Sequence, residues 1–437
     1  MRGAGTRLFG VAAAAWALSA CSEDPDPFVI AVRGPLGGKA FDGTPAVTQV
    51  ELRVRASDGV ERLVSKVPAS EGSLEVPDSA KSGIGALTLA GLADDGAIVA
   101  YGRTPPLELS GLAGQPTLAL TIFVQRVREI APMVALTAAP AKPLCAALGG
   151  RYLVVADASS TNADVVDLLD LTALREAPFT TAPATLATAG ARMLALDAAG
   201  SATLLDVAQS AQGTPTPPAG ATFAEVAGGA TVLDDTGGAW IVGPTRVAPP
   251  SDLVLRLDPT GTLVARRLTR ARSAAAATWV PGRGLVIAYG LAPSGDPPGV
   301  EVVAPGASVG APLPFAGDGQ PGGVLVPLDG ARLLRIGEDG KGTLLDLACA
   351  RDCVPSATAI ADEPRATRSD DHVTVVEGGA LIARGGRLSL LSADGTRLDL
   401  LRDVGATSVC SAALSTGGAG LSIAGSPLAH AVLAARP

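Results

Sequence analysis

A short recurring unit constrains this chain of 437 residues more than any other feature. A glycine-containing turn leads directly into a short apolar segment, as at Gly149 to Val155 and again at Gly190 to Leu196. One central residue from each unit serves as an anchor: Leu153, Leu194, Ile241, Val286, Leu334, Ile382 and Ser422. The successive spacings are 41, 47, 45, 48, 48 and 40 residues. A period near 45 residues indicates one supersecondary unit stacked repeatedly on its neighbours.

A unit of this length has room for four short strands and the turns between them. We therefore predict that residues 128–437 form a β-propeller of about seven blades, with six or eight blades as alternatives. The many turns that a propeller needs are available, because the chain contains 53 glycines and 34 prolines. The chain is expected to be all-β.

The segment before the repeats follows a different pattern. From Gln49 to Arg55 every second residue is apolar, which predicts a half-buried strand, and Asp58-Gly59 then supplies a hairpin turn. Similar short runs continue to about Val127 and predict seven or eight strands. Residues 28–127 are therefore expected to form a small antiparallel β-sandwich, which resembles immunoglobulin-like or transthyretin-like modules.

Two of the repeated units resemble kelch repeats. One is the segment around Gly284 to Gly290, and the other runs from Arg365 to His372 and is followed by Gly378-Gly379. Asp258 to Gly261 looks instead like the blades of quinoproteins. The resemblance is to a degenerate kelch-like propeller, and the propeller subfamily stays open.

The amino terminus has the pattern of an export signal. Arg2 and Arg7 precede an apolar run of 11 residues from Leu8 to Leu18, which is shorter than the roughly 20 residues that a membrane-spanning helix needs. The run ends in Leu18-Ser19-Ala20-Cys21, which resembles the lipobox of bacterial lipoproteins. The resemblance implies that residues 1–20 are a signal peptide and that Cys21 carries the lipid. The alternative is an ordinary signal peptide with an incidental cysteine.

Residues 21–27 follow as an acidic, proline-interrupted segment that suits a tether between lipid and folded protein. Ser22 after the lipidated cysteine resembles the outer-membrane sorting pattern of enteric bacteria. The expected location is the bacterial cell envelope, on the outer membrane and facing the periplasm or the surface. The membrane is the first expected partner, through the lipid anchor.

Four cysteines remain after Cys21: Cys145, Cys349, Cys353 and Cys410. In an oxidising compartment an even number favours disulfides, and four cysteines allow three pairings, among which the sequence does not choose. Cys349 and Cys353 are close enough to close a small loop, and Cys145 with Cys410 would then link the start and end of the repeat region. Four free buried thiols are a less favoured alternative in an exported protein. A zinc site is less favoured still, because the cysteine spacings are not those of zinc knuckles.

Chemistry-bearing residues are scarce. The net charge of −8 gives no footprint for nucleic acid. A glycine-rich segment at Gly317 to Gly322 and a Gly-x-Ser-x-Gly match at Gly306 to Gly310 lack the strand and helix context that their motifs require. Asp164, Asp167 and Asp170 could form an acidic stripe on a helix, but a strand and turn are favoured.

Histidine limits catalysis further, because His372 and His430 are the chain's two histidines. His372 beside Asp370 and Asp371 could form an acid/base pair in a channel, although a solvated loop is favoured. A sandwich joined to kelch-like blades also resembles the copper enzymes related to galactose oxidase, but the tyrosines and histidines needed for copper have no matching motif here. We expect no metal and no cofactor.

Two functions follow as hypotheses. The first is a membrane-anchored lipoprotein whose propeller acts as a non-enzymatic module that binds or scaffolds a protein or envelope partner. The second is an exported enzyme with a carboxylate-based site in the propeller channel, which requires acidic residues and His372 to converge at one channel mouth.

Overall fold

The computed structural model describes most of the chain after the first 28 residues. It covers residues 29–36, 40–56, 59–70, 83–112, 119–136, 139–293, 296–328, 331–338, 340–358, 372–377, 379–384, 387–403, 409–423 and 429–433. The signal peptide, Cys21 and the tether expected from the sequence therefore lie outside the described residues.

Two sheets make up an N-terminal unit, which we define as residues 29–126. One sheet is a parallel pair of β1 (Val29–Arg33) and β7 (Ala119–Phe123). The other has six strands: β2 (Gln49–Ala56), β3 (Glu61–Pro68), β4 (Ile84–Leu92), β5 (Ile98–Arg103), β6 (Leu107–Glu108) and β8 (Gln125–Arg126). The main order is β3-β2-β4-β5-β8, with β6 also paired to β4, and a short 3-10 helix, η2, covers Leu109–Leu112.

Both sheets contribute to one apolar core. Leu52 of β2 and Leu89 of β4 pack in the same cluster as Leu120 and Ile122 of β7. The expectation of a wholly antiparallel sandwich is wrong for one pair, because β1 and β7 run parallel. The reason is topological: the strands β2 to β6 lie between β1 and β7 in the chain, so β7 is reached by a crossover and no hairpin sets its direction.

Seven further sheets, each of four antiparallel strands, follow in the part of the chain that the structure describes. Sheet 1 has β10 (Pro143–Leu148), β11 (Tyr152–Asp157), β12 (Ala163–Asp167) and β13 (Thr172–Glu176). Sheet 2 has β14 (Thr185–Ala189), β15 (Arg192–Leu196), β16 (Ala202–Asp206) and β17 (Ala211–Gly213). Sheet 3 has β18 (Ala230–Leu233), β19 (Ala239–Val242), β20 (Ser251–Leu257) and β21 (Leu263–Arg272). Sheet 4 has β22 (Ala276–Val280), β23 (Gly284–Ala288), β24 (Val300–Val303) and β25 (Ala311–Pro312).

The remaining three sheets complete the series. Sheet 5 has β26 (Val324–Pro327), β27 (Arg332–Ile336), β28 (Gly342–Asp346) and β29 (Ser356–Ala357). Sheet 6 has β30 (His372–Val376), β31 (Gly379–Arg384), β32 (Arg387–Ser392) and β33 (Leu398–Asp403). Sheet 7 has β34 (Val409–Ala413), β35 (Ala419–Ile423), β36 (Ala429–Leu433) and, as its fourth strand, β9 (Ile130–Ala135).

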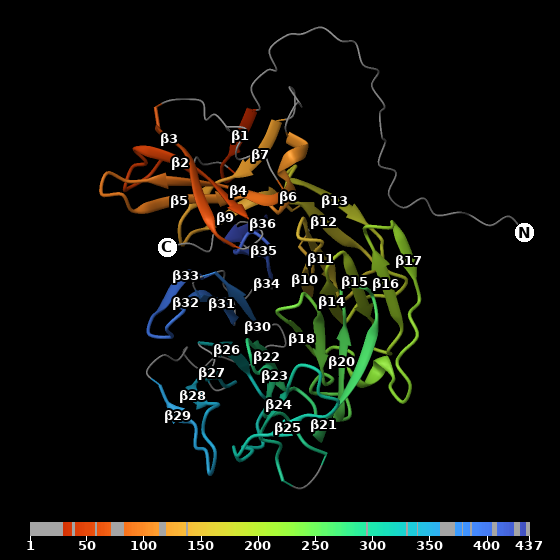
Figure 1. Cartoon of the computed structure of the whole chain (residues 1–437). Coiled ribbons are helices and arrows are strands. Elements are labelled where there is room, and N and C mark those ends of the chain that lie inside the picture. Colours follow the sequence, from red (N-terminus) through yellow and green to blue (C-terminus); the bar gives the residue numbers. More distant parts are fainter. Residues whose placement is uncertain are drawn as a thin grey trace, which may run out of the picture.

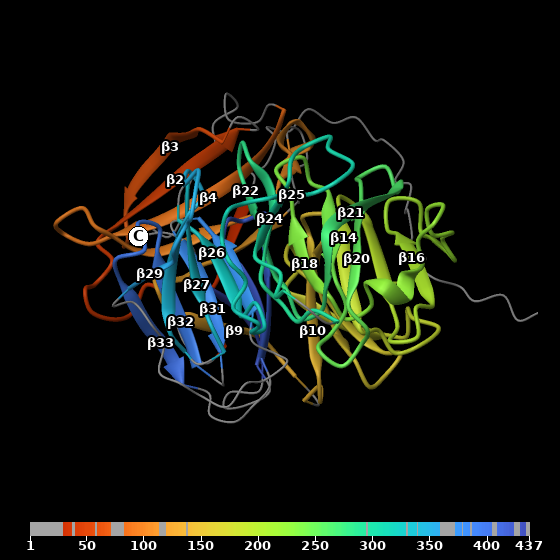
Figure 2. The ribbon, with the colours of Figure 1, turned by 90° about the horizontal axis from the view of Figure 1, so that it is seen from below.

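The seven sheets are arranged as a closed ring. The first strand of each sheet contacts the first strand of the next, and β34 of sheet 7 contacts β10 of sheet 1. Figures 1 and 2 show the sheets following one another in sequence order around this ring. Because β9 precedes sheet 1 in the chain but belongs to sheet 7, the two ends of the ring are also joined by strand pairing. This is the arrangement of a β-propeller.

Apolar side chains fill the seams between neighbouring sheets. One core cluster lies between sheets 2 and 3, with Leu194 and Ile241 among its members, and another lies between sheets 4 and 5, with Val286 and Leu333. Clusters of the same kind occupy the other five seams, and an eighth belongs to the N-terminal unit. Each sheet is thus apolar on both faces, which explains why the repeat shows continuous apolar runs.

All seven sequence anchors lie in the second strand of a sheet. Leu153 is in β11 and Ser422 in β35, and the other five occupy β15, β19, β23, β27 and β31. The glycines before these strands serve the turn: Gly190 has a φ of 56° and Gly237 a φ of 78°, which are conformations that favour glycine.

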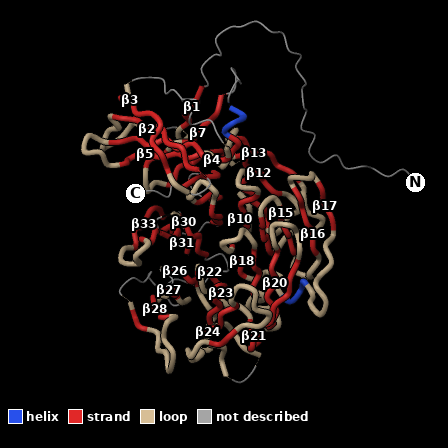
Figure 3. The backbone as a smooth tube through the Cα atoms, viewed as in Figure 1, coloured by secondary structure: helices blue, strands red, loops and turns tan. Residues whose placement is uncertain are grey.

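Helix is nearly absent from the described residues (Figure 3). Besides η2, they contain the 3-10 helix η3 (Phe223–Glu225). No helix in these residues has the length and apolar character required to cross a membrane.

Candidate functional site

The N-terminal unit contacts the ring at sheets 6, 7 and 1. Because the four strands of each sheet alternate in direction, the connections between first and second strands and between third and fourth strands share one face. Glu377 lies between β30 and β31, Thr416 between β34 and β35, and Leu168 between β12 and β13, so all three belong to this face. We call the contact of these connections with the N-terminal unit the junction.

The six-stranded sheet turns a charged face toward the junction. Along β2, Val50 and Leu52 pack into the apolar core of the unit, whereas the alternating residues Glu51, Arg53 and Arg55 are on the opposite face. Arg53 donates two hydrogen bonds to Glu51, at 3.0 and 2.5 Å. Such a face needs a polar partner, and the ring supplies one.

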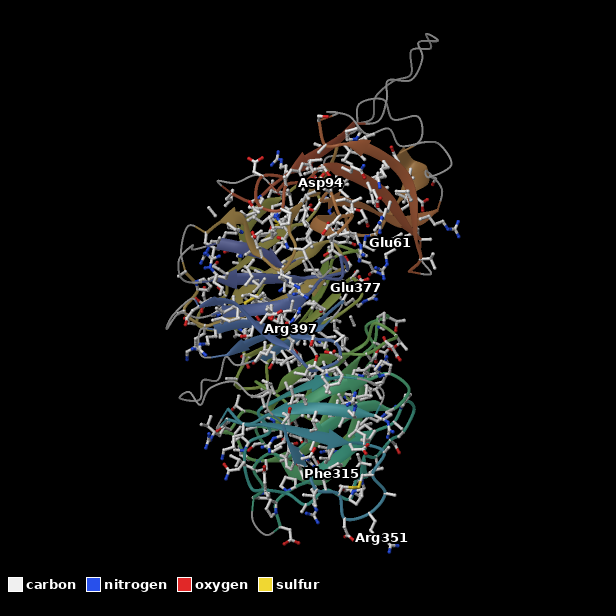
Figure 4. The ribbon with its side chains drawn as sticks, turned by 90° about the vertical axis from the view of Figure 1, so that its left-hand side faces the viewer. Glu61, Asp94, Phe315, Arg351, Glu377 and Arg397 are labelled. Atoms are coloured by element: carbon white, nitrogen blue, oxygen red, sulfur yellow. A yellow bond between two sulfur atoms is a disulfide. The ribbon has the colours of Figure 1, made fainter. Side chains whose placement is uncertain are left out.

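Arg103 of β5 is the centre of the junction. Its side chain is 2% exposed, and it forms ion pairs with Glu61 of β3 at 2.6 Å and with Glu377 of the ring at 2.9 Å. It also donates to the backbone oxygen of Thr416 at 2.9 Å. Arg55 reaches the same Glu377 at 2.9 Å. Figure 4 shows Glu61 and Glu377 near each other, one from the N-terminal unit and the other from the ring.

Burial and neighbouring groups shift the pKa values of Glu377 and Arg103 in opposite directions. Burial alone would raise the pKa of Glu377, but hydrogen bonds and charge from Arg103 and Arg55 outweigh it and hold that pKa below its usual value. Burial likewise tends to lower the pKa of Arg103, but its interactions with Tyr101, Glu377 and Glu61 raise that pKa overall. Burial raises the pKa of Tyr101 to about 12. The junction is therefore a network of fixed charges at neutral pH.

A small cavity lies beside this network. Its lining includes Tyr101, Gly102 and Gln125 from the N-terminal unit and Leu168 and Leu414 from the ring. Its volume is about 40 Å³, which leaves room for roughly three water molecules. Gln125 is 1% exposed, and its amide has no hydrogen-bond partner among the described residues. The cavity is suited to bound water and is too small for an organic substrate.

The first strands of the seven sheets form the inner wall of the ring. The seven first strands, with sequences PLCAAL, TLATA, ATVL, AATWV, VLVP, HVTVV and VCSAA, contain no Asp, Glu, Lys or Arg. Their polar contacts include a 2.7 Å hydrogen bond between the hydroxyls of Thr374 and Ser411. His372 begins β30, but its side chain, like Asp370 and Asp371, lies outside the description.

No group of three or more His, Cys, Asp or Glu side chains that could hold a metal ion occurs within the described ranges. Asp164 and Asp167 are on β12 and Asp170 is in the turn that follows, which agrees with a strand and turn. Arg151 pairs with Asp167 at 2.5 Å and with Asp170 at 3.2 Å, so two of these carboxylates serve an internal ion pair.

The four cysteines outside the amino terminus form two disulfides in the structure. Cys349 bonds to Cys353 within the connection from β28 to β29. Cys145 of β10 bonds to Cys410 of β34, and so links the first strand of sheet 1 to the first strand of sheet 7.

Sequence reasoning did not identify the junction residues. Arg103 and Glu377 are 274 positions apart, and no local pattern marks either of them. A local pattern does mark another set of ion pairs. Arg151 follows a glycine pair before β11 and pairs with Asp167 at the end of β12, and Arg192, which begins β15, pairs at 2.7 Å with Asp206 at the end of β16. In sheet 5, Arg332 is directly opposite Asp346.

The chain matches no protein-family model and no curated protein. Among solved structures, it is similar to a streptogramin B lyase structure, at 11% identity and a TM-score of 0.47, with 69% of this chain and 96% of that one covered. It is also similar to the dihydro-heme d1 dehydrogenase NirN in complex with DHE, at 14% identity and a TM-score of 0.44, with 77% of this chain and 69% of that one covered.

Proposed function

We propose that this chain is a lipoprotein of the bacterial cell envelope whose ring is a non-enzymatic binding or scaffold module. The export pattern of residues 1–20 and the sequence Leu18-Ser19-Ala20-Cys21 support the anchor. Cys21 carries the lipid in this proposal, residues 21–27 are the tether, and Ser22 favours the outer membrane.

In the same proposal, the ring is a seven-bladed propeller and the N-terminal unit is a β-sandwich that serves as a spacer. The unit follows the tether in the sequence and is fixed to the ring by the Arg103 network. It contacts the ring at sheets 6, 7 and 1, through connections that share one face. The connections between second and third strands, on the opposite face, remain available to a partner. Val247, in the connection between β19 and β20, is 94% exposed on that face.

The observation that carries a binding role is the composition of the seven first strands. A channel site for general acid/base chemistry needs side chains that exchange protons near the reacting atoms. The first strands contribute no carboxylate, lysine or arginine. Their one histidine is His372, whose side chain lies outside the description, and Glu377, beside the end of β30, is engaged by Arg55 and Arg103. A ring built in this way offers a partner a shaped surface and exposed connections to bind.

The anchor is tested by Cys21→Ala, which removes the acylated sulfur. We expect the wild-type protein to sediment with outer membranes and to incorporate labelled palmitate, and the variant to lose both properties. A matched control, Ser19→Thr, keeps the cysteine and should remain in the membrane fraction. Unchanged fractionation and labelling of the Cys21 variant would refute lipidation.

The binding role is tested by photocrosslinking in intact cells. A benzophenone amino acid at Val247 should yield a reproducible crosslinked partner on the face opposite the junction. The same probe at Leu174, which is 63% exposed on the outer strand β13, is the control for random collision. Equal crosslinking at both positions, or none at Val247, would contradict a partner on that face.

A further inference from the structure

We propose that a pocket in the seam between sheets 1 and 2 binds a small aliphatic ammonium compound, with the apolar tail inside the pocket and the ammonium group at its rim. This site depends neither on the lipid anchor nor on the partner proposed above, and it adds a small-molecule ligand to the ring. The proposal rests on the apolar lining of the pocket, its size and the charge at its rim.

Strand register places apolar side chains opposite each other in this seam. On sheet 1, Val154 of β11 is directly opposite Val165 of β12. On sheet 2, Met193 of β15 is directly opposite Leu205 of β16. Val154, Met193 and Leu205 belong to one core cluster between the two sheets. The pocket lies beside this cluster, toward the outer strands β13 and β17.

The pocket is apolar and open to solvent. Its apolar lining comprises Leu148, Val154, Val165, Met193, Leu205 and Val207. Its volume is about 60 Å³, which is roughly four to six times the space that one water molecule needs and suits an aliphatic tail of about four or five carbon atoms. Ser210, in the turn between β16 and β17, also lines the pocket and is exposed, so a ligand can enter there. Water finds few polar partners in such a pocket, and an apolar group replaces it favourably.

Glu176 of β13 supplies the charge at the rim, and it also lines the pocket. It is directly opposite Ala163, two residues from Val165 on β12, so the side chains of Glu176 and Val165 share one face of sheet 1. Glu176 is half-buried, and its carboxylate forms no ion pair or hydrogen bond with another residue that the structure describes. A free carboxylate beside an apolar pocket favours a ligand that joins a cation to an apolar tail.

The neighbouring charged side chains already have partners on other faces. Asp206 borders the pocket, but it lies opposite Arg192 on the other face of sheet 2 and pairs with it at 2.7 Å. Arg175 precedes Glu176 in β13, so it is on the other face of sheet 1, where it pairs with Asp164 at 3.5 Å. The rim of the pocket is therefore anionic.

A hydrogen bond between the two sheets borders the pocket. Gln212 of β17 donates at 3.1 Å to the backbone oxygen of Pro178, which follows β13, and both residues line the pocket. Gln212 is directly opposite Leu205, and Pro178 is buried. The position of the rim is thus fixed by contacts within the ring, and a ligand needs little rearrangement to enter.

The methionines of the chain provide a direct test, because Met193 lines the pocket whereas Met133 of β9 lines the junction cavity. The full-length protein, isotope-labelled at its methionine methyl groups, is titrated with isoamylamine and followed by NMR. We expect the Met193 signal to shift in a saturable way, with a Kd of about 1 mM, while the Met133 signal stays in place. Met193→Leu and Met133→Leu assign the two signals.

Isoamyl alcohol and isovalerate carry the same branched tail and separate the effect of the tail from that of the charge. The neutral alcohol should bind about fivefold more weakly than the amine, which is the gain expected from a partly exposed ion pair. Isovalerate should bind more weakly than the alcohol, because Glu176 repels its carboxylate. Added salt should weaken binding of the amine and leave that of the alcohol unchanged.

Three variants complete the test. Glu176→Gln removes the rim charge, so the amine and the alcohol should bind with equal affinity, and Glu129→Gln, at an exposed carboxylate between β8 and β9, should behave as the wild type. Val165→Phe should fill the pocket and abolish the Met193 shift. Equal affinities of amine and alcohol in the wild type, no saturable shift of Met193, or a Glu176→Gln variant that still prefers the amine would each overturn the proposal.

Discussion

At the scale of single residues, Glu377 decides how firmly the N-terminal unit is held. This ring carboxylate forms ion pairs with both Arg55 and Arg103, and the two arginines come from different strands of the six-stranded sheet. Its protonation would remove the charge that both guanidiniums face. The junction should therefore respond to acid through this one group more than through surface carboxylates.

The sign of this response follows from the lowered pKa of Glu377. Its folded-state pKa lies below the ordinary value of 4.5, so its contribution to stability is present above that value and is lost as the pH falls through the folded pKa. We expect Glu377→Gln to melt at a lower temperature at neutral pH and to lose less stability on acidification. The measurement is thermal denaturation as a function of pH.

Glu338→Gln is the control for the Glu377 prediction. Glu338 pairs at 3.0 Å with Arg246, whose side chain is 58% exposed, and surface pairs of this kind contribute little. Its pH profile should follow that of the wild type. If Glu377→Gln and the wild type lose stability in parallel below about pH 4.5, the role given to Glu377 is wrong.

At the scale of strands, the close approach of a neighbouring backbone segment requires glycine at position 102. The chain leaves β7 at Phe123 and joins the six-stranded sheet as β8, and this crossing lies directly over Gly102 of β5. A Cβ at position 102 would lie 2.2 Å from the backbone oxygen of Phe123. Because the obstacle is backbone, neither strand can yield by a rotamer change.

Gly102→Ala should therefore destabilise the protein. We expect the free energy of unfolding to fall by about 1–3 kcal/mol, as is typical when extra volume is forced into a packed interior. Gly213→Ala in β17 is the matched control, because no atom lies within 4 Å of the new methyl group. Urea denaturation measures both variants, and equal midpoints would contradict the close-approach argument.

The elements also show what the sequence could predict. The all-β prediction is confirmed, and the seven glycine-turn anchors mark second strands because turn chemistry and apolar runs are local signals. The place of β9 in sheet 7 and the parallel pairing of β1 with β7 depend on contacts between distant segments, and no local pattern reports them. The junction was not predicted for the same reason, because the sequence around Arg103 and the sequence around Glu377 contain no pattern that marks either residue as a contact between the unit and the ring.

At the scale of the whole molecule, two bodies meet through polar and apolar contacts, since Phe123 of the N-terminal unit packs against a ring cluster and Leu169 of the ring packs against the core of the unit. The N-terminal unit has one apolar core of its own, whereas the ring is held by seven clusters in series. The Arg103 network and a small cavity also lie between them, and we expect the network to couple the unfolding of the two bodies. A molecule of this design should unfold as one unit while the network is intact.

Arg103→Met should separate the two bodies. The methionine keeps much of the side-chain volume but leaves Glu61, which is 10% exposed, without its closest cation. Breaking a buried ion pair by removing one partner costs about 3–5 kcal/mol. Calorimetry of the wild type should show one transition, and the variant should show two, with the N-terminal unit melting first. Arg246→Met, at a side chain that is 58% exposed, should keep one transition near the wild-type temperature. A single shifted transition for Arg103→Met would mean that apolar contacts, and not the charge network, couple the unit to the ring.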